Sequence, residues 1–452
     1  MQQNENARQI AVRILTRVEK EGAYANLLLR TELAALVDIR ERHLATALVN
    51  GVLKQKLTLD YALRQHLTKP MSALPHEVRA VLRLGAFQVL NMEKIPVPVA
   101  INESVNTVKI FQKNFAPLVN SVLRKTAATG WDLPWPDRKK ETIRYLSIRY
   151  SHPEWLVKRW LKSWGLEETE QLLKANNEPA PTCIRVNTLK TSREELSQKL
   201  EEKGIKTQPS QRVPEALYLD DFESVEKIEE FKAGHFTVQD ESSQLVAHVL
   251  GVQPGDRVLD VCSSPGGKTT HCAQLMNNKG EIVALDIYPQ KLRLVDELAQ
   301  RLGITIIKTL EGDGRVLEGV EGEFQRVLVD APCSGLGVLR RRADLRWQKR
   351  EDEIKKLPDL QLAILSKAAE RVATGGELVY STCTTEPEEN FDVVKAFRKL
   401  KPEFSPVDLA QELPFAVTEE RDLKQLRKGV WQILPHIHKM DGFFIAKFRK
   451  ES

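Results

Sequence analysis

The chain has 452 residues and carries 67 Lys and Arg against 62 Asp and Glu, a formal net charge of +5. This length exceeds one ordinary domain core, so we expect two or three domains. A hydrophobic content of 42% with 29% charged residues is typical of a soluble globular protein. No apolar run approaches the ~20 residues that cross a bilayer, and the polar start of the chain lacks the apolar core of a signal peptide. We therefore predict a cytoplasmic protein rather than a membrane or secreted one.

Residues 1–140 are expected to form an all-α domain. Apolar residues recur at helical spacing around Ile14, Leu48 and Leu82, and prolines separate the segments. This part contains 21 Lys and Arg against 12 Asp and Glu, a net charge of +9, whereas the remainder carries −4. A basic module is typical of a protein that meets nucleic acid. An ordinary solvated helical surface explains the charge equally well.

Residues 141–235 are expected to form a small α/β segment. Cys183–Asn187 has the pattern of a short strand, and Ser192–Lys203 that of a helix capped by Ser192 with Glu195 three residues on. Such a unit fits an RNA-binding module. It also fits a domain that only braces its neighbour, so both interpretations stay open.

Residues 236–452 are expected to form a parallel sheet with helices on both faces. Short β-branched runs alternate with helical stretches, which is typical of a doubly wound α/β fold. A hairpin of Trp431–Leu434 and Phe443–Phe448 closes the domain. The five predicted central strands are Arg257–Cys262, Glu281–Asp286, Ile304–Lys308, Arg326–Asp330 and Glu377–Ser381.

A glycine turn follows the first of these strands. Asp260 ends the strand, and Ser263-Ser-Pro-Gly-Gly-Lys-Thr269 leads into a helix. Gly266 and Gly267 let a ligand approach the backbone closely, and the helix points its amide groups at that ligand. A phosphate-binding P-loop is the alternative, but its first required glycine falls on Cys262. A nucleotide triphosphatase therefore remains only a minor hypothesis.

Acidic residues end the neighbouring strands. Asp286 lies about twenty residues after the glycine turn, where an acid can accept hydrogen bonds from both ribose hydroxyls of a nucleoside. Asp313 follows the third strand, where it could bond an adenine amino group. One such acid would be read as a cap or turn residue, but the run of acids at successive strand ends predicts a nucleoside pocket. This pattern does not separate a dinucleotide from S-adenosylmethionine.

Two cysteines distinguish S-adenosylmethionine from a dinucleotide as the expected ligand. The five cysteines are odd in number, scattered and without CxxC spacing, which argues against disulfides and a structural metal. Cys333 lies in Asp330-Ala-Pro-Cys-Ser-Gly335 after the fourth strand, and Cys383 in Ser381-Thr-Cys-Thr-Thr385 after the fifth. Both thiols should therefore lie at the ligand-binding edge.

Paired thiols at such an edge fit the chemistry of cytosine carbon 5. This carbon is a poor nucleophile until a thiolate adds to carbon 6, after which it can attack an activated methyl group. A helix beginning near Pro387 would favour the thiolate of Cys383 through its N-terminal dipole. Asp330 could hydrogen-bond the exocyclic amine of the cytosine, and the second thiol could help to release the product. Lys268 could help to position the base or the cofactor.

At these residues the chain resembles the NOL1/NOP2/Sun family of RNA cytosine-C5 methyltransferases. The matches are Asp260–Thr270, Asp286, Asp313, Asp330–Gly335 and Ser381–Thr385. Ala100–Val105 and Leu118–Arg124 resemble a NusB-like domain, a combination similar to the bacterial Sun/Fmu (RsmB) subfamily. The chain departs from the family at Ser263 and Ser264, where alanines are common, and at Arg342 and Ala343, where His-Pro is common.

The resemblance implies a class I, seven-stranded Rossmann-like methyltransferase domain over residues 236–452, behind a NusB-like helical domain (1–140) and an α/β RNA-binding segment (141–235). It implies S-adenosylmethionine as co-substrate, no metal, and a cytosine of 16S ribosomal RNA as target, with no protein partner deducible. Cys383 is implied as the nucleophile and Cys333 as the residue that helps release. The expected cofactor-binding residues are Cys262, Ser263, Ser264, Pro265, Gly266, Gly267, Lys268, Asp286, Asp313 and Asp330. A P-loop-like ATPase and a non-catalytic RNA-binding assembly factor are the alternatives.

Overall fold

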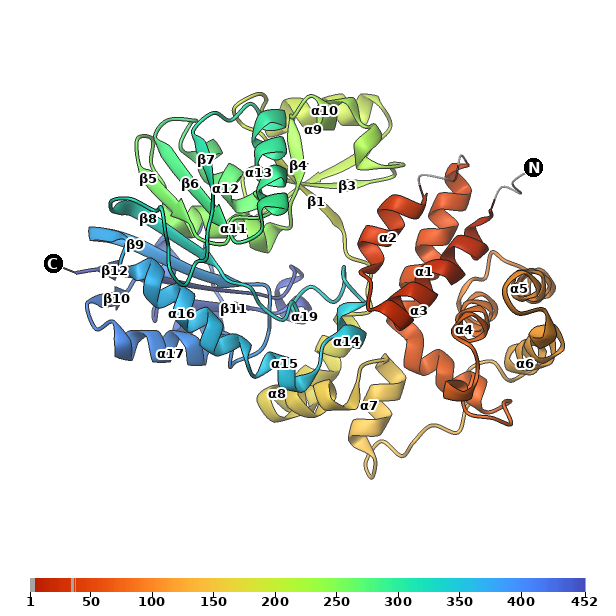
Figure 1. Cartoon of the computed structure of the whole chain (residues 1–452). Helices are drawn as coiled ribbons and strands as arrows, with labels where there is room; N and C mark the ends of the chain where they lie inside the picture. The colour runs from red at the N-terminus through yellow and green to blue at the C-terminus, as the bar shows by residue number, and fades with distance from the viewer. Residues whose placement is uncertain (1–4, 34–35, 37, 452) are drawn as a thin grey trace. The chain divides into compact units, whose positions relative to one another are not determined.

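The computed structural model describes residues 5–33, 36 and 38–451, and the chain divides into two compact units. The helical unit comprises Met1–Glu178 together with Leu339–Lys349. The α/β unit comprises Pro179–Val338 and Arg350–Ser452. Figure 1 shows the helices of residues 7–175 in red to yellow, the segment 339–349 of the same unit in cyan, and the strands of the second unit in yellow-green to blue. No helix in the described part of the chain is long and apolar enough to cross a membrane.

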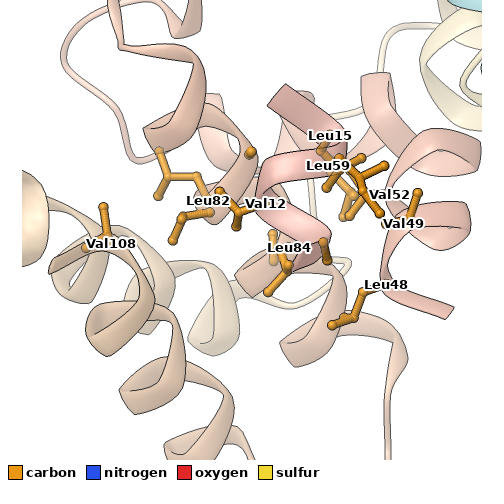
Figure 2. Packing of buried hydrophobic residues seen from close by; sticks show 14 of the residues in the cluster. Val12, Leu15, Leu48, Val49, Val52, Leu59, Leu82, Leu84 and Val108 are labelled. Carbon is orange, nitrogen blue, oxygen red and sulfur yellow. The ribbon is translucent and has the colours of Figure 1, made fainter. Parts of the chain in front are cut away.

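The helical unit is built from amphipathic helices whose apolar faces meet in one core. Asn6 caps the first helix with a capping box that includes Gln9, and Gly22, at φ +66°, ends it. Figure 2 shows side chains of this core, including Val12, Leu48 and Leu84. The helices are α1 (Ala7–Glu21), α2 (Ala25–Glu32), α3 (Ile39–Arg64), α4 (His76–Asn91), α5 (Val97–Gln112), α6 (Ala116–Thr129), α7 (Thr142–Tyr150) and α8 (Glu154–Ala175).

A distant segment, Leu339–Lys349, completes the helical unit. It contains the short helix α14 (Leu345–Gln348). The fully buried guanidinium group of Arg346 donates hydrogen bonds to the carbonyl oxygens of Ser151 and Asn176, both at 3.1 Å. The indole of Trp347 donates to the carbonyl oxygen of Leu53 at 2.8 Å. The chain therefore leaves the α/β unit six residues after Cys333 and returns to it at Arg350.

The α/β unit begins with a four-stranded antiparallel sheet in the order β2-β3-β1-β4. Ser192 caps α9 (Arg193–Glu202) with the predicted capping box to Glu195. Alternate residues of the central strand, such as Ile184 and Val186, pack against this helix. The strands are β1 (Thr182–Val186), β2 (Lys206–Pro209), β3 (Ala216–Asp220) and β4 (Phe236–Val238), and α10 (Glu229–Lys232) precedes the last.

The second sheet of the unit has eight strands. Seven follow the order β10-β12-β9-β8-β5-β6-β7, and β11 also pairs with β12. The pairs from β9 to β7 are parallel, and those of β12 are antiparallel. The strands are β5 (Arg257–Asp260), β6 (Glu281–Asp286), β7 (Ile307–Glu311), β8 (Phe324–Asp330), β9 (Val372–Thr382), β10 (Phe404–Pro406), β11 (Val430–Ile433) and β12 (Phe443–Lys450).

Helices cover both faces of this sheet because its strands are apolar on both sides. Val258 packs in one core with residues of α11 (Glu241–Leu250), α12 (Gly267–Leu275) and α13 (Pro289–Leu302). The next residue, Leu259, packs in a second core with residues of α16 (Leu357–Ala369) and α17 (Phe391–Leu400). This confirms the predicted Rossmann-like fold with a helical N-terminal part. The remaining helices are α15 (Glu351–Ile354), α18 (Glu420–Leu426) and α19 (Pro435–His438).

Three details differ from the sequence-based expectations. The sheet has eight strands rather than seven, because β11 forms the predicted hairpin with β12. The third parallel strand begins at Ile307 rather than Ile304, because α13 ends in a left-handed Gly303. The helix expected near Pro387 begins at Phe391, after a turn in which Asn390 N–H donates to the carbonyl oxygen of Pro387.

Candidate active site

The glycine turn joins β5 to α12 at the carboxyl edge of the sheet. Gly266 has φ +97°, and its N–H donates to the carbonyl oxygen of Ser263 at 2.8 Å. Ser263 N–H and Oγ both donate to the carbonyl oxygen of Leu285 on β6. A methyl group at Gly267 would meet nothing nearer than Gln239 at 3.8 Å. Residues 262–268, all expected to bind cofactor, thus form the turn that leads into the first turn of a helix.

Asp260 ends β5 beneath this turn and is 1% exposed. One carboxylate oxygen accepts a hydrogen bond from Thr269 Oγ1 at 2.7 Å, and the other has no hydrogen-bond partner. Burial raises the pKa of Asp260 to about 7. An unpartnered buried acceptor in such a place indicates a group that completes its bonding with a ligand. The sequence marked Asp260 as a strand end but not as a site residue.

Carboxylates surround Cys262, two residues further on. Burial raises the pKa of the Cys262 thiol, and so does the negative charge of Asp260, Asp330, Asp286 and Asp313. The four carboxylates therefore all lie close enough to Cys262 to act electrostatically on its thiol. A pocket with this charge suits a ligand that carries positive charge.

Two of these acids also make local bonds. Asp286 Oδ1 accepts a hydrogen bond from the N–H of Tyr288 at 3.0 Å, and the Gly312 N–H donates to the Asp286 carbonyl oxygen. Both carboxylate oxygens of Asp313 accept hydrogen bonds from the Arg315 side chain, which lowers the pKa of Asp313. Asp286 ends β6 and Asp313 follows the end of the adjacent strand β7 by two residues, as the spacing predicts, but Asp313 is already paired with the Arg315 guanidinium group.

The loops after β8 and β9 bring the two cysteines together. The sulfur atoms of Cys333 and Cys383 are 3.3 Å apart. The loops are bonded to each other, since the N–H of Ala331 donates to Ser381 and that of Gly337 donates to the carbonyl oxygen of Cys383. With Cys333 as the donor, the hydrogen bond between the sulfurs lowers the pKa of Cys383 and raises that of Cys333. Cys383 is therefore the thiol that ionises more readily.

Lys268 supplies the positive charge at this point. Its Nζ lies 2.7 Å from Asp330 Oδ2 and 5.0 Å from the ring centre of Phe443. Burial opposes its charge, but Asp330 outweighs burial, so the pKa of Lys268 is raised. Lys268 also contributes to lowering the pKa of Cys383. The helix dipole proposed from the sequence is a weaker source, because α17 begins at Phe391, eight residues after the cysteine.

Asp330 is held from a second side. Ser381 Oγ donates a hydrogen bond to Asp330 Oδ1 at 2.8 Å. The carboxylate therefore has one oxygen on a lysine and the other on a hydroxyl, which fixes its plane at the end of β8. A group oriented in this way can accept a further hydrogen bond from an amine.

Arg185 reaches this site from the antiparallel sheet, and the sequence analysis missed it. It is 1% exposed and donates to the carbonyl oxygen of Gly267 at 2.5 Å and to Thr270 Oγ1 at 2.9 Å. It also donates to the side-chain oxygen of Gln239. The sequence feature that could have identified Arg185 is its position as a single charged residue between Ile184 and Val186 in a buried strand, because buried charges need dedicated partners.

A buried cluster behind Arg185 contains Glu215, His248 and His271, whose ligand atoms all lie within 4.8 Å of one another. Glu215 Oε1 accepts from His248 Nε2 at 2.7 Å and from His271 Nε2. Burial lowers the pKa of His271 to about 4, so it is neutral at pH 7. The residues are of types that bind metals, but the hydrogen bonds within the cluster and the nearby Arg185 already satisfy the carboxylate.

This geometry, with a glycine turn, strand-end acids and paired thiols on a Rossmann-like sheet, defines a class I methyltransferase-like domain. The model of the family "16S rRNA methyltransferase RsmB/F" matches residues 247–449. Residues 152–226 match a ferredoxin-like domain of RsmF/B-like methyltransferases, and residues 5–128 match the NusB family.

Relatives resemble the chain over its full length. It is 40% identical to the probable ribosomal RNA small subunit methyltransferase B of Bacillus subtilis, covering 99% of both chains. It is 33% identical to the ribosomal RNA small subunit methyltransferase B of Escherichia coli K12, covering 100% of both. The chain belongs to the RsmB group of the 16S rRNA methyltransferase RsmB/F family.

Solved structures agree with this assignment. The crystal structure of PH0851 superposes with a TM-score of 0.82 at 28% identity and covers 100% of both chains. NSun6 from Pyrococcus horikoshii, solved with SFG, gives a TM-score of 0.59 at 28% identity over 66% of this chain and 98% of its own.

Proposed function

We propose that this protein transfers a methyl group from S-adenosylmethionine to carbon 5 of a cytosine in 16S ribosomal RNA, through a covalent adduct with Cys383. The observation that carries the proposal is the 3.3 Å contact between the sulfurs of Cys333 and Cys383 beside the glycine turn. Relatives named as small-subunit rRNA methyltransferases supply the substrate class. Family membership also favours this function over a P-loop-like ATPase.

The residues at the strand ends fit S-adenosylmethionine. This ligand carries positive charge at its sulfonium and ammonium groups, and the carboxylates of Asp330, Asp286 and Asp313 lie close enough to Cys262 to raise the pKa of its thiol. A methyl group at Gly267 would make only an ordinary contact, with Gln239 at 3.8 Å, and Asp260 has a buried carboxylate oxygen without a hydrogen-bond partner. We assign the methionine end to residues 262–268, the ribose to Asp286 and the adenine to Asp313. When bound, the cofactor supplies an electrophilic methyl group.

The chain's own residues then account for the activation of the base. Cys383, whose pKa is lowered, adds as a thiolate to carbon 6 of the cytosine, and the electron pair of the ring double bond becomes available at carbon 5. Asp330, fixed by Lys268 and Ser381, accepts a hydrogen bond from the exocyclic amine. After carbon 5 has received the methyl group, its proton passes to a solvent base, the electron pair of that C–H bond re-forms the ring double bond, and Cys383 leaves as a thiolate. We assign Cys333, beside the leaving sulfur, to this release step.

We assign RNA contact to residues 1–140 and 141–235. The net charge of +9 over residues 1–140 is the supporting observation for the first. The ferredoxin-like match over residues 152–226 supports the second. The target cytosine must be unpaired or flipped to reach Cys383, which costs a few kcal/mol for a stacked base.

The test uses the full-length protein, a 16S rRNA transcript and radiolabelled S-adenosylmethionine. We expect Cys383→Ala to abolish methyl transfer and Cys333→Ala to accumulate an RNA–protein adduct that survives a denaturing gel. Cys183→Ala, a buried cysteine of β1, is the matched control and should retain methyl transfer. Full activity of the Cys383 variant would overturn the assignment. Bisulfite sequencing of the product locates the modified nucleotide.

A further inference from the structure

One buried carboxylate joins the two cysteine loops. Glu389 is 0% exposed and follows Cys383 by six residues. Its Oε2 accepts the N–H of Ser334 at 2.8 Å, and its Oε1 accepts the hydroxyl groups of Ser334, at 2.5 Å, and Thr384, at 3.2 Å. The two hydroxyl groups are also 2.7 Å apart. Ser334 directly follows Cys333 and Thr384 directly follows Cys383, so one side chain binds the neighbours of both thiols.

The carboxylate is itself held firmly. Gln361 of α16 donates from Nε2 to Glu389 Oε2 at 3.0 Å and to the carbonyl oxygen of Pro332 at 2.9 Å. Tyr380 donates its hydroxyl to the main-chain carbonyl of Glu389 at 2.6 Å. The next residue, Asn390, donates to the carbonyl oxygen of Thr384 at 3.1 Å. Glu389 is thus fixed to β9 and α16, which gives it a rigid base from which to set the loops.

A carboxylate is a costly choice for this position. Burial raises the pKa of Glu389, which means that the fold works against its charge. Apolar residues of similar volume often stabilise a core as well as a buried charge does. A buried acid whose partners adjoin two reactive thiols is therefore better explained by what it positions than by stability alone.

We propose that Glu389 is a positioning residue that keeps the sulfur atoms of Cys333 and Cys383 in contact, and that it thereby controls the step that needs both thiols. The proposal rests on the proposed function for its catalytic consequence, but the geometric part can be tested without it. Glu389 does not itself react; it acts through Ser334 and Thr384.

The geometric test is the rate of disulfide formation between Cys333 and Cys383. Diamide oxidises the two thiols, the S–S bond forms, and both hydrogens pass to the diazene nitrogens to give a hydrazine. Because the reaction needs the two sulfurs to meet, we expect Glu389→Ala to slow it by at least about tenfold. Mass spectrometry of the linked peptides follows the reaction in the full-length protein, without RNA or cofactor.

Glu389→Gln is the matched variant. The glutamine oxygen can accept the two N–H donors now at Oε2, and its NH₂ group can donate to the hydroxyls of Ser334 and Thr384. We expect it to recover most of the disulfide rate although the charge is gone. An Ala variant that oxidises at the wild-type rate, or a Gln variant as slow as Ala, would overturn the proposal.

The catalytic readout separates positioning from loss of structure. We expect Glu389→Ala to accumulate RNA adduct as Cys333→Ala does, because release slows more than attack, while a general loss of structure would lower adduct formation as well. If Glu389→Ala does not fold, Ser334→Ala combined with Thr384→Val removes the hydroxyl links and keeps the Ser334 N–H bond. Wild-type disulfide and release rates in that variant would equally overturn the proposal. Failure of the proposed function would show in Cys383→Ala, not in the disulfide rate.

Discussion

The ammonium group of Lys268 lies 2.7 Å from the carboxylate of Asp330, at the end of the strand that leads to Cys333. Lys268 lowers the pKa of the Cys383 thiol, whereas the carboxylate of Asp330 raises it. We expect Lys268→Met to raise the pKa of Cys383, since loss of a nearby opposite charge disfavours the thiolate. The pH midpoint for alkylation of Cys383 by iodoacetamide should move upward. Lys268→Arg keeps the charge and should stay close to wild type; an unchanged midpoint in the Met variant would remove Lys268 from thiol activation.

Arg185 donates a hydrogen bond to the carbonyl oxygen of Gly267, the first residue of the helix α12 that follows the glycine turn. Arg185→Met keeps the length of the side chain but leaves Thr270 and Gln239 without their donor. We expect the dissociation constant for S-adenosylhomocysteine to rise by about tenfold or more, because a shifted glycine turn no longer presents its amides. Calorimetry measures this directly.

The control for Arg185 is Arg193→Met on the adjacent helix α9, whose side chain contacts Glu194 and the Ser210 carbonyl. It should bind the ligand like wild type. Equal affinity in both variants would show that the antiparallel sheet does not brace the glycine turn.

The sequence predicted the parts of the site that depend on strand ends. In a parallel sheet the carboxyl ends share one edge, so the positions of Asp286, Asp330 and both cysteines could be inferred from alternating strands and helices. The glycine turn could also be predicted, because it depends only on the residues between one strand and the next helix.

The sequence did not predict contacts that depend on tertiary structure. Arg185 and Gly267 are separated by 82 residues, and Ser334 and Glu389 by 55, so neither pair leaves a local pattern. The stretch Arg340–Asp344 falls in the range predicted for the third domain, yet it packs in the helical unit, which no periodicity in the eleven residues of Leu339–Lys349 could show.

The protonation of Asp260 should make stability depend on pH. Its pKa in the folded protein is about 7, against ~3.9 in an unfolded chain. Between these two pH values the folded state binds more protons than the unfolded state. The contribution of Asp260 to the free energy of unfolding is therefore fully present below about pH 4 and is lost as the pH rises through 7. The full difference is on the order of 4 kcal/mol.

Asp260→Asn removes this dependence. We expect the variant to gain melting temperature relative to wild type as pH rises from 5 to 8, equivalent to about 2.6 kcal/mol over that range. It should also bind the cationic cofactor more weakly, because one carboxylate is gone. Differential scanning fluorimetry across pH supplies the test; a difference between variant and wild type that is constant with pH contradicts a raised pKa.

Arg346 should be the residue that fixes the returning segment Leu339–Lys349 in the helical unit. Its guanidinium group is 0% exposed and bonds main-chain carbonyls of Ser151 and Asn176 and the side chain of Asn177. Arg346→Met leaves these acceptors buried without donors, at a cost of roughly 3 kcal/mol. We expect faster hydrogen exchange in α14 and at the junction of α7 and α8, while the sheet of the α/β unit keeps its protection. Arg350→Met, an exposed position four residues later, is the control. Exchange in α14 that matches this control would mean that Trp347 and its bond to Leu53 hold the segment, and that the buried charge serves another purpose.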